Sequence, residues 1–203
     1  MIKIKEKGLQ DYTSTWQEMV SFTENRNSLT EDELWTLEHK SVFTQGLSGK
    51  SEHLLKETMI EVIQSDRGGQ ITYHGPGQLI IYCMIDIKRL GIGVKQMVSI
   101  IEKSIMELLG DYSIISHKIP GAPGVYVDGS KIAALGLKVK RGKTYHGLSL
   151  NIDMNLAPYG LINPCGYKDL NVTQMSDLTD NKLELDAIKK KLTKYLTKYV
   201  SRT

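Results

Sequence analysis

Two short turns that end in glycine divide the middle of the chain and limit how it can fold. Asp128-Gly129 and Arg141-Gly142 separate three runs rich in β-forming residues, GVYV, SKIAALGLKVK and TYHGLSLNID. Two-residue turns of this kind connect neighbouring antiparallel strands, because glycine tolerates the positive φ that the turn needs. The pattern therefore predicts three consecutive antiparallel strands over roughly residues 124–153.

Other segments have the apolar spacing of amphipathic helices. This spacing predicts helices over residues 9–25, 94–109 and 185–196. Thr30 and Glu33 have capping-box spacing, which predicts a further helical turn at that point.

Three more runs, MIEVIQ, QLIIYCMI and SIISHKI, are short, β-branched and bounded by Gly, Pro or Asp, which predicts strands. Helices around a strand-rich middle favour a mixed α/β domain of the α+β kind, with a largely antiparallel sheet flanked by helices. A regular doubly wound fold is disfavoured because strands and helices do not alternate.

Length and composition narrow the class of protein. The 203 residues suit a single domain spanning residues 1–203, and the net charge of +3 is too small to indicate a nucleic-acid partner. No apolar run approaches the roughly 20 residues of a membrane span, and the N-terminal residues lack the apolar core of a signal peptide. Two cysteines far apart argue against a disulfide scaffold or a zinc site. We therefore expect a cytoplasmic protein without a metal.

The segment RGGQITYHGPGQ, residues 67–78, has the composition of a ligand-binding loop. Its glycines let the backbone approach a ligand closely and leave N–H groups available. It matches neither a phosphate-binding P-loop nor a dinucleotide fingerprint. Composition alone fits equally a pair of tight turns that join strands.

Lys131 and Cys165 are candidate chemical groups. Lys131 lies in a small, apolar segment, where it either points outward from a half-buried strand or is desolvated in a pocket. Cys165 lies between Pro164 and Gly166, a tight turn that presents a side chain, whereas Cys83 lies in an apolar strand that suits an inert thiol.

Two histidines are further candidates. His74 either orients an acyl carbonyl or supports a pocket wall, and His146 equally suits a hydrogen bond to a backbone carbonyl. Neither has a second ligand at metal-binding spacing on the same element.

Four motifs in order, RGGQITYHGPGQL, GVYVDGSKIAALGLKV, YHGLSLNI and INPCGY, resemble the lipoyl(octanoyl) transferases of lipoate biosynthesis. The resemblance covers about residues 8–178 and implies the fold of the biotin and lipoate protein ligases. It implies that Cys165 forms an acyl-thioester intermediate and that Lys131 lowers the pKa of its thiol. It also implies an acyl-binding pocket lined by Arg67, Gly68, Gly69, Gln70, Ile71, Thr72, Tyr73, His74, Ala134, Leu135, Gly136, Gly147, Leu148 and Ser149.

The activity implied by the resemblance is transfer of an octanoyl group from acyl carrier protein to a specific lysine of lipoate-dependent enzyme domains. The acceptors would be lipoyl domains of 2-oxoacid dehydrogenases and the glycine cleavage H protein. The donor is carried on phosphopantetheine, so no cofactor and no ATP are expected, and we expect a monomer. Two alternatives remain: an ATP-dependent lipoate ligase, which would need no thiol, and a non-catalytic acyl-carrier-binding protein.

A basic hairpin lies close in sequence to these motifs. Lys138, Lys140, Arg141 and Lys143 flank the second glycine turn. Such a rim would steer an acidic carrier towards the pocket, although charged turns are also common as solvated hairpin tips.

Overall fold

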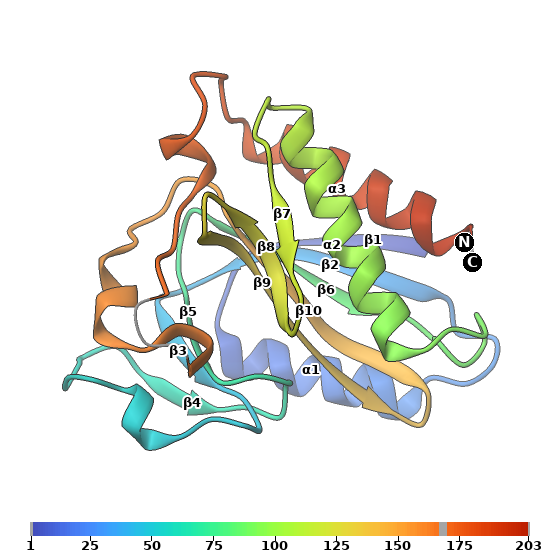
Figure 1. Ribbon diagram of the computed structural model, residues 1–203. Coiled ribbons are helices and arrows are strands. Elements are labelled where there is room, and N and C mark those ends of the chain that lie inside the picture. Colours follow the sequence, from blue (N-terminus) through green and yellow to red (C-terminus); the bar gives the residue numbers. More distant parts are fainter. Residues whose placement is uncertain (1, 167–169, 203) are drawn as a thin grey trace.

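The computed structural model describes residues 2–166 and 170–202, apart from the side chain of Cys165. Its main sheet has seven strands in the order β1-β2-β6-β10-β9-β8-β7, and a smaller sheet has the order β4-β3-β5 (Figure 1). The strands are β1 (Ile2–Gln10), β2 (Asp32–His39), β3 (Val42–Gln45), β4 (Val62–Gln64), β5 (Ile71–His74), β6 (Gln78–Met84), β7 (His117–Ile119), β8 (Ala122–Val127), β9 (Ser130–Lys140) and β10 (Lys143–Asn151).

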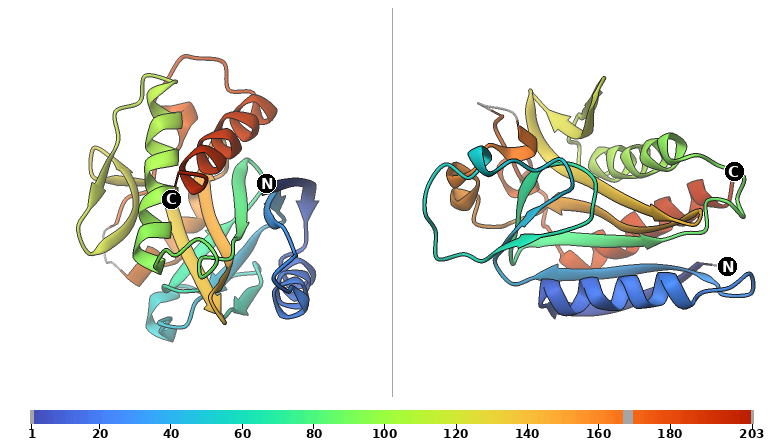
Figure 2. Two further views of the ribbon diagram at one scale, coloured as in Figure 1. Left: turned by 90° about the vertical axis from the view of Figure 1, so that its right-hand side faces the viewer. Right: turned by 90° about the horizontal axis from the view of Figure 1, so that it is seen from below.

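Three long helices cover the two faces of the main sheet. Helix α1 (Tyr12–Asn25) lies on one face, and α2 (Val94–Gly110) and α3 (Leu185–Val200) lie on the other (Figure 2). The larger core packs α2 and α3 against the sheet, and a smaller core places Met19 of α1 against Trp35 and Tyr82. The expected mixed fold with a largely antiparallel sheet is confirmed. Across the described residues, no helix has the length and apolarity needed to cross a membrane.

Short 3-10 helices complete the connections. They are η1 (Ser51–His53), η2 (Ala157–Leu161), η3 (Pro164–Gly166) and η4 (Met175–Asp177). Three of the four lie between β10 and α3, a segment that the sequence patterns left without a predicted element.

The two glycine turns form as predicted. Asp128 and Gly129 have φ values of 46° and 80°, and Arg141 and Gly142 have 51° and 79°. The three strands β8, β9 and β10 are antiparallel neighbours. Strand β9 is longer than β8, which pairs with it only over Ser130 to Ala133 within the described residues. The edge of β9 beyond Ala133 is therefore available to another segment.

Local signals were wrong or displaced at two places. Residues 32–39 form a strand and not a helical turn, because this segment pairs with both β1 and β6 in the middle of the sheet. Thr30 bonds to Asn27 and does not cap a helix. Residues 2–10 form β1, so α1 begins only at Tyr12, after the side chain of Asp11 accepts a hydrogen bond from Ser14 N (3.0 Å).

Candidate active site

A cavity of about 480 Å³ lies on the α1 side of the main sheet, beneath the glycine-rich segment. It is lined by most of the residues expected in the pocket: Arg67, Gly69, Gln70, Thr72, His74, Ala134, Leu135, Gly136, Gly147, Leu148 and Ser149. Tyr12, Ile80, Tyr82 and His146 complete the lining, and the first three carry no sequence signal of such a role. The largely neutral lining suits a small apolar ligand.

Three of the expected residues lie elsewhere. Ile71 and Tyr73 point into a separate apolar cluster with Phe43, because alternate residues of β5 face opposite sides. Gly68 lines the neighbouring cavity instead. The pocket segment is therefore a strand whose even-numbered residues, Thr72 and His74, face the cavity.

The glycine-rich loop closes the cavity by crossing the available edge of β9. Gly68 N donates to Leu137 O at 3.1 Å. A Cβ atom at Gly136 would lie 2.9 Å from Gly68 O, so a side chain at that position would push the loop away from the strand. Glycine at position 136 is what lets the loop lie directly against β9.

Arg67 holds this loop in shape. Its Nε donates to Thr44 Oγ1 (3.0 Å), and Nη2 donates to Gln70 O (2.7 Å). Nη1 donates to Gly68 O (3.0 Å). These hydrogen bonds tie both ends of the loop to β3, while the aliphatic stem forms part of the cavity wall. The geometry makes Arg67 a support of the wall.

His74 is a neutral, hydrogen-bonded wall residue. Its Nδ1 donates to Gln78 Oε1 (2.7 Å), so Nε2 accepts from Thr44 Oγ1 (3.3 Å). Burial, with a smaller contribution from the nearby His39, lowers the pKa of His74 to about 3. At neutral pH the ring is uncharged and its tautomer is set by its partners.

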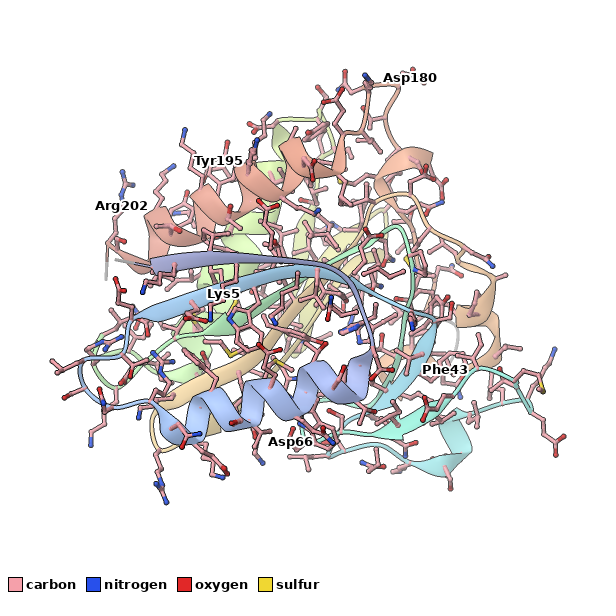
Figure 3. All side chains as sticks on the ribbon, turned by 180° about the vertical axis from the view of Figure 1, so that it is seen from behind. Lys5, Phe43, Asp66, Asp180, Tyr195 and Arg202 are labelled. Atoms are coloured by element: carbon pink, nitrogen blue, oxygen red, sulfur yellow. The ribbon has the colours of Figure 1, made fainter. Side chains whose placement is uncertain are left out.

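Asp66 anchors the far side of the cavity and was not recognised from the sequence. It accepts hydrogen bonds from Trp16 Nε1 (2.8 Å), His146 Nε2 (2.9 Å) and the Tyr145 hydroxyl, and Figure 3 shows it next to α1. Burial would raise the pKa of Asp66, but these hydrogen bonds outweigh it and lower the pKa to about 2. One carboxylate thus joins α1 to β10.

His146 is set by the same carboxylate. Burial lowers its pKa, and the ionised Asp66 only partly opposes that shift. Because Nε2 donates to Asp66, Nδ1 of the neutral ring is a buried acceptor to which none of the described residues donates. The expectation of a hydrogen bond to a backbone carbonyl is not met, since the partner is a carboxylate.

Lys131 is buried, with 4 % of its surface exposed, so it does not point outward from β9. Its Nζ donates to Pro123 O (3.3 Å) and lies 5.1 Å from the centroid of the Tyr126 ring. Its backbone pairs with the chain that follows the cysteine motif, through Lys131 N to Asn171 O (2.8 Å) and Thr173 N to Lys131 O (3.0 Å). The segment after Cys165 therefore covers Lys131.

The backbone on either side of Cys165 lies at this same place. Pro164 lines a small cavity together with Lys131 and Thr72. Gly166 packs against Gln70, since a Cβ at Gly166 would lie 2.2 Å from Gln70 Nε2. The side chain of Cys165 lies outside what the structure describes, but its two neighbours contact the Lys131 cavity and the acyl cavity. Cys83, in contrast, is buried in β6, which raises its pKa to about 12.

The basic hairpin is partly engaged with α1. Lys140 forms an ion pair with Glu24, and Lys143 Nζ donates to Arg26 O (2.7 Å). Lys138 and Arg141 have no such contact with α1 among the described residues. The four cations therefore do not form one continuous rim.

Comparison with known proteins shows which family this chain resembles in sequence and in fold. The family model for the lipoyl protein ligase A/B catalytic domain matches residues 11–197. An octanoyltransferase of Vesicomyosocius okutanii is 57% identical over 201 residues, covering 99% of this chain and 98% of that protein. An octanoyltransferase of Chromobacterium violaceum is 53% identical over 189 residues, covering 93% and 91%. A putative lipoate protein ligase from T. acidophilum has the same fold, with a TM-score of 0.79 at 12% identity, covering 98% of this chain and 85% of that one.

Proposed function

This chain belongs to the octanoyltransferases that carry the lipoyl protein ligase A/B catalytic domain, and we propose the route by which it transfers the octanoyl group. Octanoyl-acyl carrier protein donates the group to Cys165. A lysine of a lipoyl domain or of the glycine cleavage H protein then accepts it. Because the donor is already a thioester, this route uses no ATP and no cofactor.

One observation supports the route above the others: the chain around Cys165 packs onto the only buried lysine among the described residues. Pro164 and Lys131 line one cavity, and Gly166 touches Gln70 at the edge of the acyl cavity. The backbone next to the proposed nucleophile, a buried lysine and an apolar cavity are therefore neighbours, which supports this route. That combination is what acyl transfer through an enzyme thiol requires.

The chemistry proceeds in two steps. The Cys165 thiolate attacks the carbonyl carbon of the donor thioester, the carrier sulfur leaves as a thiol after taking a proton, and octanoyl-Cys165 remains. The acceptor amine then attacks this thioester, an amide forms, and the cysteine sulfur is released. Lys131 has two roles in this scheme. As an ammonium group it stabilises the thiolate, and as a neutral amine it accepts the proton of the attacking lysine.

The test is the intact mass of the protein after incubation with octanoyl-acyl carrier protein. We expect the wild type and Cys83→Ala to gain one octanoyl group, mapped to the peptide that contains Cys165. Addition of a lipoyl domain should move the group to the domain. Cys165→Ala should gain nothing, with an unchanged circular dichroism spectrum. An adduct on folded Cys165→Ala, or one that a lipoyl domain does not remove, would contradict the route.

A further inference from the structure

A second cavity of about 930 Å³ lies on the α2 side of β9 and shares a wall with the acyl cavity. Both cavities are lined by Gly69, Gln70, Leu135 and Gly136. These four residues belong to the glycine-rich loop and to the β9 edge that it crosses. The two cavities therefore meet at the edge of β9, one on each face of the sheet.

This second cavity is a groove along β9, with a near end at Lys131 and a far end away from it. At the near end, Gly124 lies against Lys131, because a Cβ at Gly124 would be 3.0 Å from Lys131 Cε. Gly124 N donates to Glu102, so this part of α2 also lies at the near end. Helix α2 and β9 both extend from there towards the β9–β10 turn. Val94, two turns before Glu102, and Leu137, six residues after Lys131, therefore lie at the far end. At about 3.3 Å per residue, β9 spans roughly 20 Å between Lys131 and Leu137.

The lining indicates the chemistry of a ligand that would fit the groove. Val94, Val98, Leu135 and Leu137 supply aliphatic surface, with Pro123 and the glycine backbone between them. Lys131 is the single charged side chain that lines the groove within the described residues. An apolar groove with one cation, at the end nearest the chemistry, suits a long and neutral chain. A nucleoside triphosphate would need several cations along its length.

We propose that this groove binds the pantetheine arm through which the acyl donor is carried, an inference that rests on the proposed function. The arm is neutral and carries two amides and a geminal dimethyl group. From sulfur to phosphate it has about thirteen bonds and extends roughly 15 Å, which fits between Lys131 and Leu137. The phosphate end then lies near Leu137, at the far end of the groove.

This arrangement separates the two substrates in space. The long arm of the donor occupies the whole groove, whereas the amine of an acceptor lysine needs only the end at Lys131. A change at the far end should therefore affect acylation of the enzyme and leave the second transfer alone.

The experiment compares two small donors with bulky variants at the far end. Octanoyl-pantetheine fills the groove, and octanoyl-N-acetylcysteamine ends near Lys131. Val94→Trp fills the far end and Val98→Trp fills the middle of the groove, both from a partly exposed helix surface. Ser99→Trp, on the exposed face of α2, is the matched control. Acylation is followed by intact mass, and the second step is followed by adding a lipoyl domain to isolated octanoyl-enzyme.

We expect the wild type to show a KM for octanoyl-pantetheine about tenfold below that for the short donor, because the arm buries apolar groups in the groove. In both groove variants the KM for octanoyl-pantetheine should rise about tenfold. The KM for the short donor and the rate of the second step should match the wild type. Ser99→Trp should match the wild type throughout. Equal KM values for the two donors in the wild type, or equal losses with both donors in the two groove variants, would overturn the groove assignment. Failure of both donors to acylate Cys165 in the wild type would instead refute the proposed function.

Discussion

Acid should destabilise this protein well above the pH at which its carboxylates titrate. His39 and His74 are both buried, and burial lowers their pKa values to about 4 and about 3. Burial keeps both rings neutral, whereas the hydrogen bond of His39 to the backbone oxygen of Gln10 (3.1 Å) only partly opposes the lowering of its pKa. The Tyr82 hydroxyl (2.6 Å) contacts the other nitrogen of the His39 ring. In the unfolded chain the same groups have a pKa near 6.5.

The sign follows from proton uptake. Below pH ~6.5 the unfolded chain binds protons that the folded protein does not, so the stability present above that pH is lost as the pH falls. Between pH 7 and pH 5 each of the two histidines lowers the free energy of unfolding by about 2 kcal/mol, which makes about 4 kcal/mol together. That is a large part of the ~5–15 kcal/mol that stabilises a typical domain.

Urea unfolding at pH 7, 6 and 5, followed by tryptophan fluorescence, measures this loss. His39→Gln should reduce the stability lost between pH 7 and pH 5 by about 2 kcal/mol, whatever it does to stability at pH 7. His117→Gln changes an exposed histidine of β7 and should leave the pH dependence as it is. An unfolding free energy that changes by less than ~1 kcal/mol from pH 7 to pH 5 would refute the reasoning. So would an unchanged pH dependence in His39→Gln.

Two further predictions concern the residues around the thiol. Lys131→Met should slow alkylation of Cys165 by iodoacetamide at neutral pH by about tenfold, since a lost ammonium reduces the thiolate fraction; an unchanged rate would remove Lys131 from this role. Gly166→Ala should destabilise the fold by about 1 kcal/mol, because Gly166 has a φ of +78°. It should also lower the rate of octanoyl transfer by about tenfold, because a Cβ at this position would displace the Gln70 carboxamide. A normal rate of transfer would show that the position of Gln70 does not matter.

Much of the sheet and two of the helices follow from local sequence. The positive φ values of the Asp128-Gly129 and Arg141-Gly142 turns are properties of two residues each, so the β8–β9–β10 antiparallel unit is predictable without any long-range contact. The apolar periodicity of α2 and α3 is similarly local. The four motifs were sufficient to identify the family, and most of the residues that they placed in a pocket line one cavity.

Other features depend on residues far apart in the sequence. The segment after Asn27 has a capping signal, yet it becomes β2, because pairing with strands on both sides outweighs a single cap. Asp66 became recognisable only when the fold brought Trp16 and His146 to its Oδ1 atom. No spacing in the sequence joins those residues.

The site itself divides in the same way. The sequence alone determined which groups are available, a lysine in a small apolar strand and a cysteine in a Pro-Cys-Gly turn. Whether Lys131 faces solvent or the interior was undecided until residues 171–173 were seen to pair with its backbone and cover it. The cavity likewise forms only because β8 is shorter than β9. The glycine-rich loop can therefore cross the edge of β9 and close the cavity. The tertiary structure decided both, because burial and enclosure come from segments that are distant in sequence, and local propensity carries no information about them.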